Sequence, residues 1–237
     1  MKFKRILFKI SGEAMMGDQN FGHDLRAIHK ISKEIKKIWD MNIEICLVIG
    51  GGNIFRGVSV SSELMDRTSA DYMGMLATIM NGIALQSSLE KCGVQTRMQT
   101  AIDMNRICEP YIRRKAIRHL EKGRVVIFVA GTGNPFFTTD TASVLRASEM
   151  ECDAIFKGTQ VDGVYDRDPK KYPDAERYDQ ISFDRAIQLD VRVMDPTAFT
   201  LARDTNMPIV VFKMSDEDSL LKAIRGEGKY TIVSNIK

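Results

Sequence analysis

Short, almost continuously apolar runs alternate along the chain with stretches in which apolar residues recur every three or four positions. The runs predict β-strands at residues 6–10, 43–49, 94–98, 125–130, 154–156 and 209–212. One helix is predicted to begin at Asp24, with an apolar face formed by Leu25, Ile28, Ile31, Ile35 and Ile38. A helix over residues 139–150 and another ending near Gly93 are also predicted, the latter from Met73, Leu76, Met80 and Ile83.

Continuous rather than alternating apolar strands indicate that both faces of the sheet are covered, which is typical of a parallel sheet between helices. The sequence therefore predicts an α/β fold with an open, mostly parallel central sheet and helices on both faces. Its 237 residues are enough for one domain built on a single large sheet, or for two lobes that share that sheet. Residues 166–178 are polar and broken by prolines, which predicts a surface excursion or a lobe boundary.

Composition excludes several classes of function. The chain has 34 Lys and Arg against 31 Asp and Glu, and a net charge of +3 is too small to indicate nucleic acid binding. The longest apolar runs are far shorter than the roughly 20 residues of a membrane-spanning helix, and Lys9 interrupts any secretion signal. The four cysteines and three histidines form no metal-ligand or disulfide pattern, so no metal site is assigned. We expect a cytoplasmic protein without a membrane partner.

Four predicted strands run into turns rich in glycine and polar residues, at residues 9–12, 50–53, 131–135 and 157–159. The carboxyl ends of parallel strands meet at one edge of a sheet, where such folds bind ligands. Glycine lets backbone N–H groups approach a ligand closely. Four such turns at one edge indicate a binding site.

Cations and hydroxyl groups at the same edge indicate that the ligand carries phosphates. Lys9, Arg56 and Lys157 supply positive charge, and Thr138 and Thr139 stand at the start of a predicted helix. Two carboxylates have alternative interpretations. Asp140 and Asp195 either hold a metal or orient a lysine, or they serve only as a helix cap and as the residue before a helix opened by Pro196.

Other phosphate-binding classes are excluded by their motifs. The chain contains no G-x-x-x-x-G-K-[ST], H-R-D or D-F-G sequence, which excludes P-loop NTPases and protein kinases. Gly131-Thr132-Gly133 resembles the start of a dinucleotide fingerprint, but Phe136 occupies the position of its third glycine. A dehydrogenase is therefore a poor second choice.

Six sequence blocks together resemble the bacterial UMP kinase family, which has the amino acid kinase fold. They are K-I-S-G-E-A (9–14), V-I-G-G-G-N-x-x-R-G (48–57), D-Y-M-G-M-L-A-T (71–78), G-T-G-N-P-F-F-T-T-D (131–140), V-D-G-V-Y (161–165) and F-T-L-A-R-D (199–204). The match runs essentially end to end. It implies transfer of the γ-phosphoryl group of ATP to UMP with Mg²⁺, giving UDP and ADP in pyrimidine nucleotide synthesis by a homohexamer.

The resemblance also implies roles for individual residues. Lys9, Asp140 and Asp195 would be catalytic. An N-terminal lobe would bind UMP and a C-terminal lobe ATP, with a boundary near residues 150–160. ATP would contact Lys9, Ile10, Ser11, Gly12, Gly52, Arg56, Thr159, Tyr165 and Asp168. UMP would contact Gly51, Asp71, Thr132, Gly133, Asn134, Pro135, Phe136, Phe137, Thr138 and Thr139. A carboxylate at Asp71 would repel phosphate, so it is expected to accept hydrogen bonds from the ribose hydroxyls.

Regulation is predicted from a basic stretch and two departures from the family pattern. Residues 105–124 hold seven Lys and Arg against two Glu, and residues 109–122 have the length of a helix. Arg97 and Arg124 match family positions near an effector site. Gln86 and Glu90 stand where members that respond to GTP commonly carry basic residues. We therefore expect weak or absent GTP activation, with UTP still inhibiting at the UMP site.

A third departure is Gln160, which stands where the family commonly has Lys and weakens any catalytic role for a cation there. Two alternatives to a UMP kinase stay open from the sequence. One is a non-catalytic uridine-nucleotide sensor on the same fold. The other is an amino acid kinase relative with a carboxylate or carbamate acceptor.

Overall fold

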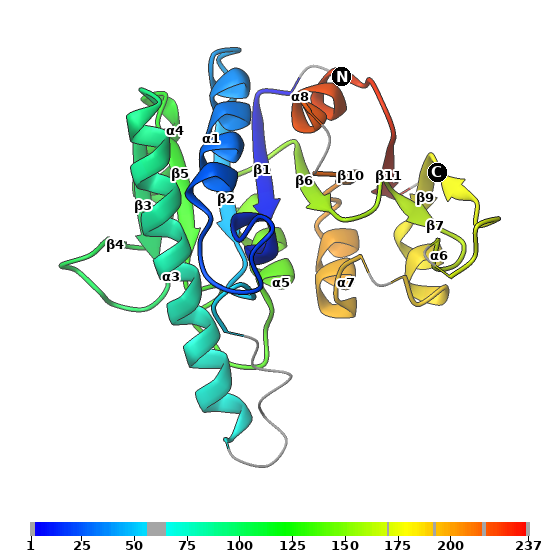
Figure 1. The fold of residues 1–237 in the computed structure, drawn as a ribbon, viewed down its shortest axis with the longest axis horizontal. Helices are drawn as coiled ribbons and strands as arrows, with labels where there is room; N and C mark the ends of the chain where they lie inside the picture. The colour runs from blue at the N-terminus through cyan, green and yellow to red at the C-terminus, as the bar shows by residue number, and fades with distance from the viewer. Residues whose placement is uncertain (1–2, 56–64, 170, 192, 215–216, 236–237) are drawn as a thin grey trace.

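A nine-stranded sheet forms the centre of the molecule in the computed structural model, which describes residues 3–55, 65–169, 171–191, 193–214 and 217–235 (Figure 1). Its strand order is β4-β3-β5-β2-β1-β6-β10-β11-β9. Within this sheet only β10 and β11 pair antiparallel. The strands are β1 (Arg5–Ile10), β2 (Glu44–Ile49), β3 (Thr96–Thr100), β4 (Glu109–Pro110), β5 (Val125–Val129), β6 (Ala154–Thr159), β9 (Gln180–Ser182), β10 (Ile209–Lys213) and β11 (Tyr230–Ser234).

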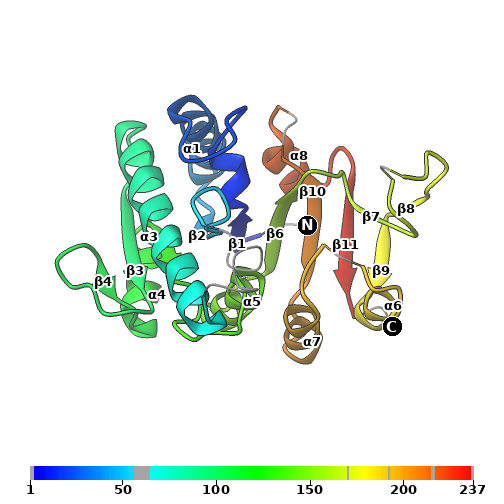
Figure 2. The same ribbon diagram turned by 60° about the horizontal axis from the view of Figure 1, so that its bottom comes forward.

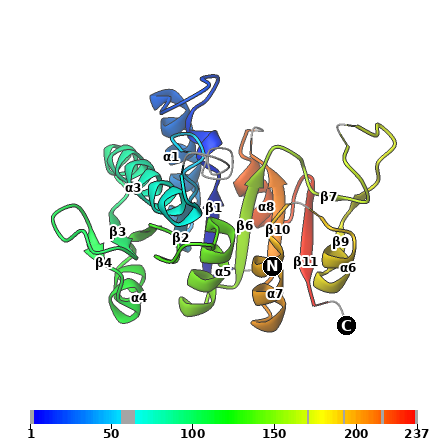
Figure 3. The ribbon, with the colours of Figure 1, turned by 90° about the horizontal axis from the view of Figure 1, so that it is seen from below.

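Helices cover both faces of this sheet (Figure 3). One face carries α1 (Leu25–Trp39), α3 (Arg67–Lys91) and α8 (Ser219–Arg225), which contribute to one apolar cluster. The opposite face carries α4 (Arg113–Glu121), α5 (Thr139–Glu149), α6 (Phe183–Gln188) and α7 (Pro196–Asp204), which contribute to a second cluster. A 3-10 turn, η1 (Gly12–Met15), follows β1, and the short strands β7 (Val164–Tyr165) and β8 (Arg177–Tyr178) form a separate antiparallel ribbon.

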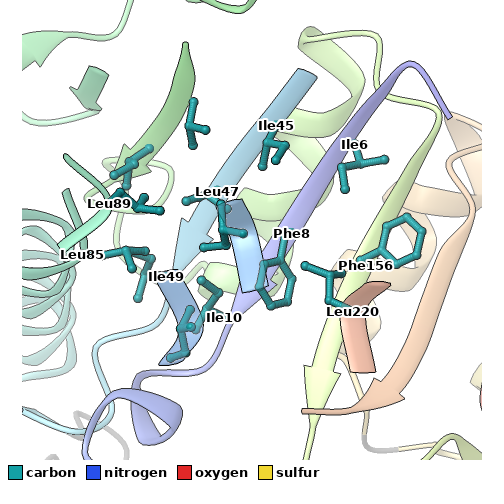
Figure 4. Packing of buried hydrophobic residues seen from close by; sticks show 14 of the residues in the cluster. Ile6, Phe8, Ile10, Ile45, Leu47, Ile49, Leu85, Leu89, Phe156 and Leu220 are labelled. Atoms are coloured by element: carbon teal, nitrogen blue, oxygen red, sulfur yellow. The ribbon is translucent and has the colours of Figure 1, made fainter. Parts of the chain in front are cut away.

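The central strands divide their side chains between these two clusters, because successive residues of a strand point to opposite faces. Ile6, Phe8 and Ile10 of β1 belong to the cluster under α1 and α3 (Figure 4), whereas Leu7 belongs to the cluster under α5. The rings of Phe8 and Phe212 lie 6.1 Å apart between their centroids and extend the first cluster toward β10. The predicted α/β fold with a mostly parallel sheet covered on both faces is confirmed.

The parallel strands β1, β2, β5 and β6 end at the same edge of the sheet (Figure 2). The four turns singled out in the sequence therefore lie side by side. The sheet continues across the expected lobe boundary near residues 150–160, since β1 pairs with β6. Of the predicted excursion at residues 166–178, the described residues 166–169 and 171–176 lie between the two strands of the β7–β8 ribbon, and residues 177–178 form β8.

The helix predicted to end near Gly93 is confirmed as α3, but the prediction of its buried face is wrong. Its supposed core residues are between 41% and 52% exposed: Met73, Leu76, Met80 and Ile83. The face that contacts the sheet instead includes Thr78, Asn81 and Gly82 beside Leu85 and Leu89. A count of apolar positions does not detect this face, because polar and small residues occupy part of it. The apolar side chains of Met73, Leu76, Met80 and Ile83 remain exposed.

Smaller corrections concern element ends. Leu25 is 76% exposed, because it begins α1 beyond the edge of the core, although Asp24 does cap that helix as expected. The strand predicted at residues 94–98 runs from Thr96 to Thr100. Residues 109–122 form the short strand β4 followed by α4 rather than one helix. Among the described residues, no helix is long and apolar enough to cross a membrane.

Candidate active site

Two lysines stand side by side near the carboxyl ends of β1 and β6. The strand register aligns Lys9 with Lys157. Both occupy the same strand face as Leu7 and Ile155, which belong to the cluster under α5, and both side chains reach the first turn of that helix. Each lysine is only 7% exposed, and such buried ammonium groups require a charged partner.

Asp140, in the first turn of α5, is that partner. Lys9 Nζ lies 2.8 Å from Oδ1 of Asp140, an ion pair without hydrogen-bond geometry. Lys157 Nζ donates a hydrogen bond of 2.6 Å to Oδ2. Two cations therefore share one carboxylate, and this group of three side chains, the Lys–Asp–Lys cluster, keeps a net positive charge.

The cluster shifts the pKa values of its members in opposite ways. Burial alone would raise the pKa of Asp140, but the charges of Lys9 and Lys157 outweigh it and hold that pKa at about 2. Burial lowers the pKa of Lys157 and the neighbouring Lys9 charge lowers it further, while Asp140 and Asp195 raise it, which leaves it at about 8. Asp140 is thus a permanent anion at neutral pH, whereas Lys157 titrates within a biologically accessible range.

Asp195 and Thr138 connect the starts of α5 and α7. Thr138 caps α5 by accepting hydrogen bonds from the backbone N–H groups of Asp140 and Thr141. Its hydroxyl in turn donates to Asp195, as does the hydroxyl of Thr141. Asp195 caps α7 by accepting from the N–H of Ala198. Two helix N-termini are thereby held beside the cluster, and helix N-termini favour bound anions.

Two glycines allow the turns after β1 and β2 to approach each other. A Cβ at Gly12 would lie 2.7 Å from the backbone nitrogen of Gly52. A Cβ at Gly51 would lie 2.7 Å from the carbonyl oxygen of Gly74 in α3. Only glycine fits at these positions without displacing backbone, so the turns leave their N–H groups close to a shared space.

Three cavities adjoin one another along this edge. The acceptor-side cavity, about 320 Å³, includes Gly51, Asp71 and Thr139 in its lining. The central cavity, about 400 Å³, is lined by Lys9, Lys157 and also by Gly51 and Thr139. The outer cavity, about 460 Å³, shares Val161 with the central one. The shared linings make a continuous path past both lysines.

Many residues expected at the site line this path. The central cavity contains the predicted ATP residues Lys9, Ser11, Gly12, Gly52 and Thr159. The outer cavity contains Tyr165 and Asp168. The acceptor-side cavity contains the predicted UMP residues Gly51, Asp71, Thr132, Phe137, Thr138 and Thr139. The structure therefore brings most of the two predicted sets of residues to the lining of one path, with Gly51, Gly52 and Thr139 shared by two of its cavities. Which ligand each set binds remains a prediction.

Other expected residues lie differently. The side chain of Ile10 is fully buried in the core under α1 and α3, so only its backbone is available to a ligand. Phe136 is 69% exposed. It belongs to the turn after β5 with three more predicted UMP residues that are absent from the cavity lining given above, Gly133, Asn134 and Pro135. Arg56 lies outside the described residues.

The predicted effector residues lie away from this path. Arg97 is in β3 and Arg124 directly precedes β5, both at the amino ends of their strands and so at the opposite edge of the sheet. Arg124 Nη1 donates to Nδ1 of His119 at 3.1 Å, and Arg97 Nη1 donates to the carbonyl oxygen of Thr96. Their role as an effector site stays a prediction.

Sequence reasoning missed the place of Lys157 in the cluster and missed Arg67 altogether. The sequence alone predicts Lys157 only as one of the cations at this edge of the sheet. The signal was a repeated pattern: Ile6-Leu7-Phe8-Lys9 and Ala154-Ile155-Phe156-Lys157 both end an apolar run with Phe-Lys, and the register pairs them residue by residue. Arg67 lines the acceptor-side cavity and precedes Asp71 by four residues, a spacing that places both on one face of a helix.

Comparison with known proteins identifies the family. Residues 4–213 match the model of the amino acid kinase family. The chain belongs to the amino acid kinase family. Within this family it is 57% identical over 237 residues to the uridylate kinase of Wolbachia pipientis wMel, a match that covers 100% of this chain and 96% of that relative. It is 56% identical over 231 residues to a uridylate kinase of Cereibacter sphaeroides, covering 98% of this chain and 94% of the relative.

The fold is also similar to those of two solved UMP kinase structures. The UMP kinase from Bacillus anthracis matches with a TM-score of 0.96 and 38% identity, over 100% of this chain and 98% of that one. The UMP kinase from Ureaplasma parvum matches with a TM-score of 0.94 and 40% identity, over 99% of this chain and 100% of that one. The resemblance to bacterial UMP kinases inferred from the sequence motifs is confirmed.

Proposed function

We propose that the chain is a UMP kinase, which transfers the γ-phosphoryl group of ATP to UMP and gives ADP and UDP. The observation that carries the proposal is the Lys–Asp–Lys cluster, whose two lysines line the central cavity. The central cavity adjoins the acceptor-side cavity through Gly51, Gly52 and Thr139, and Thr139 directly precedes Asp140. Phosphoryl transfer needs positive charge placed between two phosphate-bearing ligands, and little covalent chemistry from the protein. The names of the relatives supply the acceptor, UMP.

The proposed reaction forms a bond between a phosphate oxygen of UMP and the γ-phosphorus, and breaks the bond from that phosphorus to the β,γ-bridging oxygen. A phosphate monoester has a second pKa of about 6, so its attacking oxygen is already ionised at neutral pH. No general base is needed. Asp140, with a pKa of about 2, would be a poor base and is assigned the task of orienting the two lysines.

Lys9 and Lys157 are assigned to the charge that develops on the transferred group. Both are buried, where a cation stabilises an anion more strongly than it does in water. The N-termini of α5 and α7, held together through Thr138 and Asp195, add further positive potential on the same side. ATP would extend from the central cavity into the outer one, with its adenosine near Tyr165 and Asp168.

Mg²⁺ is proposed to accompany ATP. Across the described ranges no group of three or more His, Cys, Asp or Glu side chains is arranged to hold a metal. Asp140 is engaged by two lysines, and Asp195 accepts from two hydroxyl groups and a backbone N–H. This donor set fits an ion held chiefly by the phosphates, as is common for Mg²⁺. When bound, the ion neutralises charge on the β- and γ-phosphates.

Assembly and regulation complete the proposal. We propose a cytoplasmic homohexamer, and the exposed apolar face of α3, with Met73, Leu76 and Met80, supports an association between subunits. Residues 1–237 would form one domain with an N-terminal UMP lobe and a C-terminal ATP lobe divided near residues 150–160. UTP is proposed to inhibit at the UMP site, with weak or absent activation by GTP. Light scattering measures the mass of the assembly in solution and so tests the proposed hexamer.

A coupled assay of ADP release tests the reaction. The purified chain is expected to release ADP only when ATP, Mg²⁺ and UMP are all present. Carbamate or acetylglutamate in place of UMP is expected to give no turnover, and a positive result there would indicate a relative with another acceptor. Binding of UMP or UTP without any ADP release would refute the kinase and indicate a nucleotide sensor.

A further inference from the structure

Arg67 forms an ion pair with the carboxylate of Asp71 in the lining of the acceptor-side cavity. It lies one helical turn before Asp71 in α3, and its Nε donates to Oδ1 at 2.8 Å and to Oδ2 at 2.9 Å. The Arg67 side chain is 40% exposed, whereas that of Asp71 is 13% exposed. The pair therefore joins a partly exposed guanidinium group to a mostly buried carboxylate, and both residues line the acceptor-side cavity.

Asp71 also holds the turn that follows β5. The backbone N–H of Phe136 donates to Oδ2 of Asp71 at 2.7 Å. Phe136 has a φ of +71°, a left-handed conformation that is rare for a bulky residue and persists only when its surroundings hold it. The guanidinium carbon of Arg67 lies 5.8 Å from the centre of the Phe136 ring. We call these three residues the acceptor triad.

We propose that Arg67 is a positioning residue for recognition of the acceptor's sugar. It fixes the orientation of Asp71 so that one carboxylate oxygen remains directed at ribose hydroxyls while the other holds Phe136. This inference rests on the proposed function. A carboxylate offers about four acceptor sites, and three hydrogen bonds within the triad leave Oδ1 with room for a sugar hydroxyl.

Arg67 has two separable effects on the site. Its charge compensates the Asp71 carboxylate, which would otherwise repel the phosphate of an approaching nucleotide. Its Nε–H, which points in a direction set by the rigid guanidinium group, also contacts both carboxylate oxygens and so restrains the orientation of the carboxylate. A lysine at this position keeps the charge but loses the fixed donor direction, since its ammonium group is a point charge on a flexible stem. Arg67→Ala and Arg67→Lys therefore distinguish compensation from orientation.

The kinetic test compares these variants with a matched control. Lys36, in the last turn of α1, forms an i,i+4 ion pair with Asp40, the residue that follows the helix; the distance is also 2.8 Å, and 38% of the Lys36 side chain is exposed. Arg67→Ala is expected to raise KM for UMP about tenfold, with KM for ATP changed less than about twofold, and to lower the kcat/KM preference for UMP over dUMP about fivefold. Arg67→Lys is expected to restore KM for UMP but not the preference. Lys36→Ala is expected to change neither.

A double-mutant cycle tests whether Arg67 acts through Asp71. Asp71→Asn is expected to abolish most of the preference for UMP over dUMP, because the oriented carboxylate is lost. In that background Arg67→Ala is expected to lower the preference no further. Additive losses in the double variant would show that Arg67 acts on the nucleotide by another route, and would overturn the inference.

Hydrogen–deuterium exchange tests the triad without any turnover. The Phe136 amide is bonded to Asp71, so Arg67→Ala is expected to speed exchange across residues 131–137, and Lys36→Ala is not. Unchanged exchange overturns the inference, whether or not the chain phosphorylates UMP. Faster exchange in a protein without UMP turnover would refute the proposed function and the sugar's role, while retaining Arg67 as the support of Asp71. An active enzyme in which Arg67→Ala keeps its full preference for UMP also overturns the inference.

Discussion

The lowered pKa of Lys157 predicts a basic limb in the pH profile of the reaction. With a pKa of about 8, Lys157 in the free enzyme is about nine-tenths protonated at pH 7 and about one-tenth protonated at pH 9. If the ammonium form is required, kcat/KM falls about tenfold between pH 7 and pH 9. Bound ATP brings negative charge near Lys157 and raises its pKa, so the limb of kcat is expected at higher pH than that of kcat/KM.

Two substitutions separate the titration of Lys157 from other effects. Lys157→Arg keeps a cation throughout this range, because arginine does not deprotonate in proteins, and is expected to abolish the limb. Lys157→Met removes the cation and is expected to lower kcat by about 10² to 10³, the usual scale for one group that stabilises the transition state. Titration of the nucleotides themselves is the same for all three enzymes, so it cannot account for a difference between them.

As the pH rises, the contribution of Lys157 to the free energy of unfolding changes in the opposite direction to its contribution to activity. The pKa of Lys157 is lowered from 10.5 to about 8 by folding, so between these values the unfolded chain binds more protons. Stability from this residue alone therefore rises with pH over that window. Initial rates of ADP release and thermal unfolding, both measured from pH 6.5 to 9.5, distinguish loss of the cation from unfolding. Identical kcat/KM profiles for the original enzyme and Lys157→Arg would refute the reasoning.

Three further predictions concern the cluster, the effector and α3. Lys9→Ala is expected to lower kcat by about 10² to 10³ with little change in Tm; activity within a few-fold of the original would contradict its role. GTP titrated at fixed ATP and UMP is expected to activate weakly or not at all, and strong activation would show that Gln86 and Glu90 do not weaken the site. In urea unfolding, Gly74→Ala is expected to stabilise by about 0.5–1 kcal/mol, since no atom lies within 4 Å of an added Cβ. Gly82→Ala is expected to destabilise by about 1–3 kcal/mol, because its Cβ would lie within 2.7 Å of side chains in β3 and β5; equal effects would contradict the packing argument.

The central strands were predictable because they are buried on both faces and so contain apolar runs, which in β1 and β6 reach as far as Lys9 and Lys157. The buried face of α3 was not predictable in this way. Asn81 is fully buried there, and its amide donates to the carbonyl oxygen of Gly50 and to the side chain of Asn53. His23 Nε2 lies 2.6 Å from the Asn81 side-chain oxygen. This polar network ties the helix to the glycine turn after β2, and hydrogen bonds between distant segments leave no periodic signal in a sequence.

The site shows the same division between local and tertiary information. Residue types at strand ends indicated phosphate binding, but Asp140 and Asp195 were equivalent by sequence, each standing near a helix start. The structure separates them. Thr138 takes the capping position of α5, which leaves the Asp140 carboxylate free to meet two lysines from neighbouring strands. Asp195 is itself a cap and accepts the Thr138 hydroxyl. A shift of two residues in where α5 begins would make Asp140 the cap and remove the anion that holds Lys9 and Lys157 together, so the proposed chemistry depends on a helix boundary, which is the feature that local sequence specifies least well.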